Sequence, residues 1–241
     1  MSDNFRFLIV GAGRGGTSLL AALLDYHSQL EVGFEQHAES CLMGKALPPG
    51  VPITFEGRVG AFMAACHADA DRYAGRIWGN KITTEQVLSL ETAPPPASAG
   101  SFDVLNALFN QHLRDQAVVF ILRDGRACVN SKVRRTGQPM EIACRKWLYS
   151  VECYQFFKTR HPRSLCVKFE DLLAAPESTL RSTCELLGIP YEPGMLEGVA
   201  NEKMLPDYRS ATIDRSKRAP ADLPEPHLES IRAGLIECGY L

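Results

Sequence analysis

One kind of unit occurs twice in this sequence and constrains its fold more than any other feature. Each unit is a short apolar run, a glycine-containing turn and a stretch with helical spacing of apolar residues. The three parts are residues 5–10, 11–16 and 17–26 in the first unit, and 117–122, 123–126 and 127–135 in the second. Continuous apolar runs are typical of parallel strands, which helices cover on both faces. The sequence therefore predicts an α/β fold with a parallel sheet.

Further elements extend this pattern along the chain. Residues 164–169 have the composition of a third strand, and 76–79 that of the end of another. Residues 176–187 are predicted to form a helix, since a proline lies in the first turn and a glycine follows the last one. The proline-rich segment 93–100 is interpreted as a loop and not a domain linker. A length of 241 residues suits one sizeable core, so we expect a single domain over residues 1–241.

The composition excludes several classes of protein. The formal net charge is −2 and there is no block of like charges, which disfavours a nucleic-acid-binding protein. None of the eight cysteines forms a C-x-x-C pair and no histidine is spaced to complete a zinc site, so we predict core thiols in a reducing compartment and no metal. The first residues do not have the pattern of a signal peptide or a membrane span. We therefore expect a cytoplasmic protein without a membrane partner; its oligomeric state has no signature in the sequence.

The first glycine loop is predicted to bind a phosphate. It lies between a strand and a helix, where backbone N–H groups and the helix N-terminus attract anions. Gly11, Gly13 and Gly16 match the dinucleotide pattern G-x-G-x-x-G, and Glu31 follows about 20 residues after the first glycines. An NAD(P)- or FAD-dependent oxidoreductase of the Rossmann type is therefore one hypothesis.

Two other interpretations of this loop differ in where they place a positive charge. The nucleoside triphosphate pattern G-x-x-x-x-G-K-[ST] fits as far as its second glycine, but Thr17 and Ser18 then stand where lysine and Ser/Thr should be. The missing lysine disfavours a kinase or an ATPase. In the third interpretation the cation is Arg14, inside the loop.

A second group of polar residues follows the strand 117–122. Arg123 ends this strand, and Ser131 lies eight residues later in the predicted helix, so both side chains can meet one anion. The alternative is a surface ion pair between Arg123 and Asp124. Since ligands bind at the carboxyl ends of parallel strands, both loops should lie at the same edge of the sheet.

These two segments resemble the donor-binding motifs of the sulfotransferase family. Residues 14–18 are similar to its 5′-phosphosulfate loop, [KR]-[ST]-G-[ST]-[ST], and residues 123–131 to its 3′-phosphate motif, R-D-x-R-x-x-x-x-S. Gly15 departs from the usual Ser or Thr, so one hydroxyl contact is missing or replaced. Residues 165–176 and 186–190 also look like the E-D-L and L-G-[IL]-P segments of this family.

The resemblance is to bacterial-type enzymes related to tyrosylprotein sulfotransferases, and it implies a fold, a donor and a reaction. The implied fold is a three-layer P-loop NTPase-like fold with a central parallel sheet. The implied reaction is in-line transfer of a sulfuryl group from 3′-phosphoadenosine 5′-phosphosulfate (PAPS) to a hydroxyl or amine, with release of PAP and without a metal. The residues implied in donor binding are Arg14, Gly15, Gly16, Thr17, Ser18, Arg123, Ser131, Ser216 and Lys217.

The same resemblance suggests catalytic residues. Glu35 follows the loop cation at the spacing of the glutamate base, with His37 as its competitor. Lys81 lies in Trp78-Gly-Asn-Lys81, which looks like the family's W-G-[DN]-K-[TS]-P segment, and together with Arg14 it would stabilise developing charge. Residues 36–75 and 196–241 are expected to line the acceptor pocket. Their sequence leaves a small molecule, a sugar or a peptide open as the acceptor.

Overall fold

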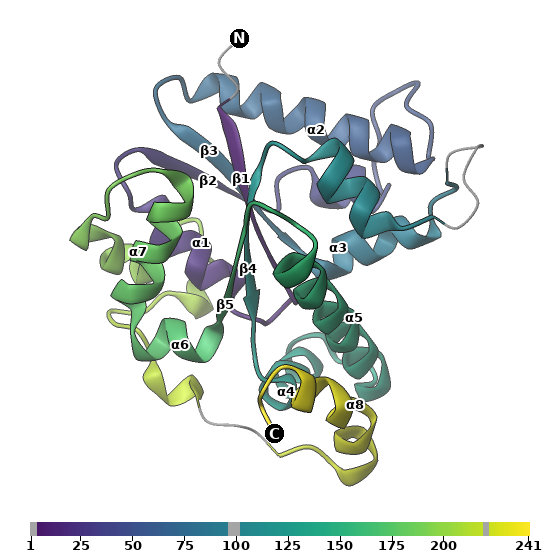
Figure 1. Ribbon diagram of the computed structural model, residues 1–241, viewed down its shortest axis with the longest axis vertical. Coiled ribbons are helices and arrows are strands. Elements are labelled where there is room, and N and C mark those ends of the chain that lie inside the picture. Colours follow the sequence, from purple (N-terminus) through teal and green to yellow (C-terminus); the bar gives the residue numbers. More distant parts are fainter. Residues whose placement is uncertain (1–3, 96–101, 219–221) are drawn as a thin grey trace.

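The computed structural model of the protein describes residues 4–95, 102–218 and 222–241 and has a parallel sheet at its centre (Figure 1). The five strands have the order β2-β3-β1-β4-β5, and every neighbouring pair is parallel. The strands are β1 (Phe5–Gly11), β2 (Leu30–Phe34), β3 (Ile77–Thr83), β4 (Ala117–Leu122) and β5 (Ser164–Lys168). The predicted parallel sheet is confirmed. Strand β2 was not predicted, and β3 continues beyond Gly79 to Thr83.

Helices cover both faces of the sheet, which gives the predicted three layers (Figure 1). On one face lie α1 (Thr17–Asp25), α6 (Phe169–Ala174) and α7 (Pro176–Leu187). The other layer contains α2 (Phe55–Arg72), α3 (Thr84–Leu88), α4 (Gly125–Thr136), α5 (Met140–Thr159) and α8 (Glu225–Glu237). Short π or 3-10 segments are Ala38–Leu42, Ser89–Thr92, Asn106–His112, Pro193–Ala200, Pro206–Tyr208 and Arg215–Arg218.

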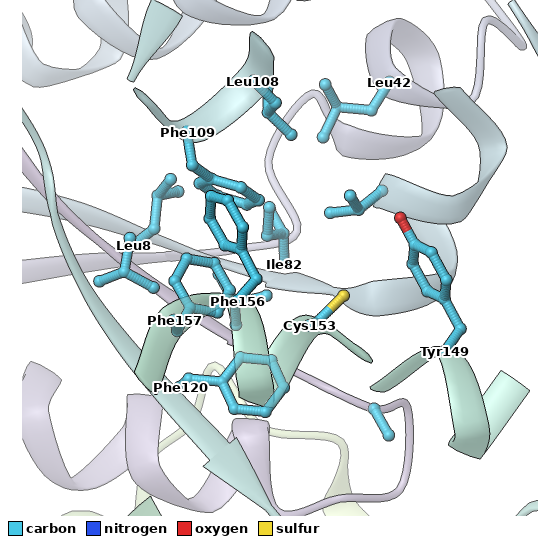
Figure 2. Close-up of a cluster of buried hydrophobic side chains, with 14 of the residues drawn as sticks. Leu8, Leu42, Ile82, Leu108, Phe109, Phe120, Tyr149, Cys153, Phe156 and Phe157 are labelled. Atoms are coloured by element: carbon cyan, nitrogen blue, oxygen red, sulfur yellow. The ribbon is translucent and has the colours of Figure 1, made fainter. Parts of the chain in front are cut away.

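The alternation of side chains along the strands builds two cores. In β1, Phe7 and Ile9 pack against the α1 layer, while Leu8 and Val10 face the opposite layer. Figure 2 shows part of the second core, in which the ring of Phe157 of α5 meets the rings of Phe109 and Phe156 edge-on. Its ring centroid lies 4.7 Å from that of Phe109 at an interplanar angle of 73°. Edge-to-face pairs of this kind add stabilisation beyond the area that they bury.

The eight cysteines occupy the positions expected of core thiols. All are free, and only Cys166 is not fully buried. Within the described residues, no helix is both long enough and apolar enough to cross a bilayer.

Gly79 in β3 gives a direct test of this packing. A Cβ atom at this position would lie 2.3 Å from Cζ of the Phe7 ring, which belongs to the core between the sheet and the α1 layer. We expect Gly79→Ala to lower the free energy of unfolding by about 1–3 kcal/mol through overpacking. Chemical denaturation measures the change.

Gly60→Ala is the matched control for this substitution. Gly60 is exposed on α2 and no atom lies within 4 Å of its added Cβ. Alanine should therefore stabilise the helix by about 0.5–1 kcal/mol. Equal effects of the two substitutions would contradict the packing described for β1 and β3.

Candidate functional site

A cavity of about 280 Å³ lies where β1, β4 and β5 end. The glycine loop and the N-terminus of α1 form one wall, and the residues after β4 form another. The wall includes most of the donor-binding residues predicted from sequence, namely Arg14, Gly16, Thr17, Ser18, Arg123, Ser131 and Lys217. Segments more than 100 positions apart in the sequence thus meet in one space.

Two glycines of the loop, Gly15 and Gly16, lie where a Cβ atom would come too close to its neighbours. Gly16 precedes α1 with φ 99°, and a Cβ there would lie 2.2 Å from the Phe169 ring. The N–H of Gly15 donates to the Ala12 carbonyl at 2.8 Å, and a Cβ on Gly15 would approach the same oxygen to 2.8 Å. Gly15 does not line the cavity. The tight turn gives a physical reason for glycine where the resembling family has Ser or Thr.

Arg14 joins the two motifs. Its Nε donates to Oγ of Ser131 at 3.1 Å, although the two residues come from different units of the sequence. Its guanidinium also stacks over the ring of Tyr208, with the carbon Cζ 4.6 Å from the ring centroid, and contacts the Tyr208 hydroxyl. The cation predicted inside the loop is therefore held at the cavity wall by Ser131 and Tyr208.

Arg123 is the second cation of the cavity, and its side chain is largely desolvated. It donates to the Arg14 carbonyl at 3.2 Å and to the Lys217 carbonyl at 3.3 Å, and it lies over the Phe169 ring at 4.6 Å. Burial lowers the pKa of Arg123. Its Nε is buried and has no hydrogen-bond partner among the described residues. A cation with an unused donor on a cavity wall suits an anionic ligand.

The alternative pairing of Arg123 with Asp124 is wrong. The Asp124 carboxylate instead accepts from Nη2 of Arg126 at 2.6 Å, and it caps α4 by accepting from the Arg126 backbone N–H at 2.9 Å. Asp124 therefore fixes the start of the helix that carries Ser131.

The cavity also contains residues that the sequence did not assign to donor binding. Arg134 lines the cavity and follows Ser131 by three positions, so both lie on the same side of α4. This spacing is the sequence signal by which Arg134 could have been predicted. Phe169 directly follows β5, and Tyr208 comes from a short 3-10 segment with no recognisable pattern. The charged side chains lining the cavity are Arg14, Arg123, Arg134 and Lys217 against one carboxylate, Asp214. This imbalance favours a ligand with more than one negative charge.

Glu35 and Lys81 lie together but do not line this cavity. The Glu35 carboxylate contacts the Lys81 ammonium, and its other oxygen accepts from Nε2 of Gln86 at 2.6 Å. Glu35 follows β2 with φ 60°, and its backbone N–H donates to the Lys81 carbonyl at 2.7 Å. Lys81 is 4% exposed, so it is not a solvated lysine. The Glu35 side chain is 35% exposed, which leaves the carboxylate accessible.

His37 and Glu31 belong to a different cavity, of about 530 Å³, beside the edge strand β2. Nε2 of His37 is hydrogen-bonded to the Asp69 carboxylate at 2.7 Å. Glu31 forms ion pairs with Arg76 at 3.0 Å and with Lys203 at 2.5 Å, and β3 separates its strand from the glycine loop. In the dinucleotide fold the corresponding acidic strand is next to β1, so this sheet order does not suit a Rossmann enzyme.

Other expectations about residues near the site have mixed outcomes. Ser216 is exposed and its hydroxyl donates to Asp214 at 2.6 Å, so it does not form part of the wall as Lys217 does. Of the apolar residues in segments 36–75 and 196–241 that were expected near an acceptor, Phe55 and Phe62 are core residues. Met204 and Tyr208 of the same set line the cavity of about 280 Å³. Within the described ranges, no group of three His, Cys, Asp or Glu side chains is arranged to hold a metal ion.

Cys128 lies against the loop, where its thiol contacts the Gly13 carbonyl at 3.6 Å. Burial raises the pKa of Cys128 to about 12, although Arg123 and Arg14 act in the opposite direction. We expect iodoacetamide to leave Cys128 unmodified in the native protein at about pH 8, because only the thiolate reacts. Peptide mass spectrometry after unfolding in guanidinium gives the fully labelled control. Rapid labelling of native Cys128 would contradict this environment.

Comparisons with known proteins point to one family. The model described as "Sulfotransferase family" matches residues 54–193. The sulfotransferase domain from the curacin biosynthetic pathway is 18% identical, with a TM-score of 0.65 and 98% of both chains covered. That from the olefin synthase of Synechococcus PCC 7002 is 17% identical, with a TM-score of 0.62 and coverage of 95% of this chain and 93% of that chain.

A mouse sulfotransferase complexed with PAP is more distant. It is 11% identical, with a TM-score of 0.50, and the match covers 97% of this chain and 84% of the mouse protein. No curated protein matches the sequence. The solved structures confirm the expected fold, a P-loop NTPase-like sheet between layers of helices.

Proposed function

Because the chain belongs to the sulfotransferase family, we propose that it transfers a sulfuryl group from PAPS to an acceptor hydroxyl or amine and releases PAP. One observation supports this choice of donor. Arg14 of the first loop donates a hydrogen bond to Ser131 of the second motif at the wall of one cationic cavity. We further propose that residues 1–241 act as one sulfotransferase domain. The family match and the position of Glu31 favour this function over a dinucleotide-dependent oxidoreductase.

The cavity suits a donor with phosphates at two positions of its adenosine. The helix N-terminus at Thr17 and Ser18 and the loop backbone would bind the 5′-phosphosulfate. Arg123 and Ser131 would bind the 3′-phosphate, with the buried Nε of Arg123 as a free donor. Aromatic and apolar side chains at the same wall offer a surface for the adenine; they are Phe169, Leu173, Met204 and Tyr208.

The proposed reaction is an in-line displacement at sulfur. A new bond forms between the acceptor oxygen or nitrogen and sulfur, while the bond from sulfur to the 5′-phosphate oxygen breaks and leaves its electrons on that oxygen. Arg14 and Lys81 would stabilise this charge, and Glu35 would accept the acceptor's proton. Contacts with Lys81 and Gln86 hold the Glu35 carboxylate in position. A sulfuryl group carries less charge than a phosphoryl group, so we propose that these side chains serve without a metal.

Arg123 tests the assignment of the donor. Arg123→Ala removes a charge-assisted contact worth about 1.5–3 kcal/mol, so PAP affinity should fall by about one to two orders of magnitude. Isothermal titration calorimetry measures the change. Arg181→Ala is the control, because Arg181 pairs with Glu177 on the exposed surface of α7. Wild-type affinity for PAP in Arg123→Ala would refute this donor site.

Glu35 tests the assignment of the base. Glu35→Gln keeps the shape of the side chain and its contact with Lys81 but accepts no proton, so turnover should fall by about 10²- to 10⁴-fold. PAP affinity should change little, because Glu35 does not line the donor cavity. Steady-state kinetics with the true acceptor, together with calorimetry, separate these two effects.

Two results would assign Glu35 a different role. A joint loss of thermal stability, PAP affinity and turnover would make it a structural partner of the buried Lys81. A loss of turnover in His37→Asn, with none in Glu35→Gln, would transfer the base to the histidine that Asp69 holds.

A further inference from the structure

An ion pair lies beside the glycine loop and is not part of the cavity wall. Glu85, in the first turn of α3, accepts a hydrogen bond from the backbone N–H of Gly13 at 2.9 Å. A Cβ on Gly13 would come within 3.2 Å of this carboxylate, so glycine permits the close approach. The ammonium group of Lys132, on α4, contacts the same carboxylate. The glycine loop is therefore held by a carboxylate, whose negative charge would repel a bound anion.

Lys132 is almost completely buried. Its side chain is 6% exposed and that of Glu85 is 17% exposed. Burial lowers the pKa of Lys132 to about 7, and the charges of Lys146 and Arg14 act in the same direction. The Glu85 carboxylate contacts the ammonium group, and an opposite charge in contact favours the charged form of a lysine. The sequence neighbour of Lys132 is Ser131, which accepts the hydrogen bond from Arg14. The pair thus lies between the loop and the helix that carries the second motif.

The first turn of α3 also contacts the proposed base. Gln86, the residue after Glu85, donates to the Glu35 carboxylate at 2.6 Å. Two consecutive side chains of α3 therefore hold the glycine loop and Glu35 in place. An unneutralised charge on Glu85 would act at short range on any phosphate in the loop, because screening is weak at buried sites.

We infer that Lys132 is a positioning residue of the donor site, which neutralises Glu85 so that this carboxylate can hold the Gly13 N–H without repelling the donor's phosphates. The inference rests on the proposed function, because it assumes that the loop binds PAPS. It assigns Lys132 no contact with the donor. Its positive charge compensates the negative charge of Glu85, so that this carboxylate can lie beside a site that binds anions.

The test measures PAP affinity in variants that separate charge from hydrogen bonding. Lys132→Met exposes the loop to the Glu85 charge, so PAP should bind about tenfold to a hundredfold more weakly. The double variant Glu85→Gln with Lys132→Met removes both charges, and the glutamine oxygen can still accept from Gly13. Its PAP affinity should return to within about threefold of wild type. The Michaelis constant for PAPS should rise in Lys132→Met by much more than kcat falls.

Lys146→Met is the matched control. It removes a lysine near the same site, but Lys146 donates to Gln138 and does not contact Glu85. Its PAP affinity should stay within about threefold of wild type. Thermal unfolding checks that each variant is folded. If Lys132→Met does not fold, Glu85→Gln alone replaces it, and removal of the carboxylate charge should tighten PAP binding.

Three outcomes would overturn the inference. One is wild-type affinity for PAP in Lys132→Met, and another is affinity in the double variant as weak as in the single one, which would mean that Lys132 only supports the fold. The third, relevant if Lys132→Met is unfolded, is unchanged or weaker binding by Glu85→Gln. A wild-type protein that does not bind PAP at all would instead refute the proposed function on which the inference rests.

Discussion

The parallel pairing of β1 with β4 is the constraint on which the site depends. Gly11 lies opposite Ile121 in this pair, and a Cβ on Gly11 would be 2.4 Å from the Ile121 carbonyl oxygen. The close approach brings the loop after β1 and the turn after β4 to the same edge of the sheet. Arg123 can then donate to the Arg14 carbonyl, and Arg14 to Ser131. Two motifs separated by about half of the chain become one cationic wall.

Two arginine side chains lie close together in this wall, and a bound anion would reduce the electrostatic repulsion between them. Burial lowers the pKa of Arg123, and the nearby positive charge of Arg14 acts in the same direction. Carbonyl oxygens, a hydroxyl and aromatic faces compensate for only part of their lost hydration. A polyanion bound in the cavity would complete the compensation, so it should stabilise the native state by mass action.

The sequence predicted those parts of the fold whose signal is local. Strand β4 and helix α7 have the predicted bounds, because one is a continuous apolar run and the other begins with Pro176 and ends before Gly188. Strand β2 was missed because Glu31 and Gly33 interrupt its apolar residues, and Leu30 and Val32 are buried by tertiary packing on the α1 side of the sheet. Helix α2 has many small and polar residues and is fixed by tertiary packing.

The same distinction holds for the site. The glycine loop and the Arg123 to Ser131 segment carry their own spacing, so the residues that line the cavity from these two segments could be named from sequence. The contact of Tyr208 with Arg14 could not be predicted, since only the fold brings this short segment near the C-terminus over Arg14. The pairing of Glu35 with Lys81 likewise follows from the register of β2 and β3, which no sequence pattern specifies.

In the proposed function, the two motifs bind the two phosphate positions of one adenosine donor. The most direct test compares the dissociation constants of PAP and of AMP, which lacks the 3′-phosphate, in the wild type and in Ser131→Ala. We expect the wild type to prefer PAP by about tenfold or more, and Ser131→Ala to lose much of this preference while its AMP affinity is nearly unchanged. Equal affinities of the wild type for PAP and AMP would contradict it.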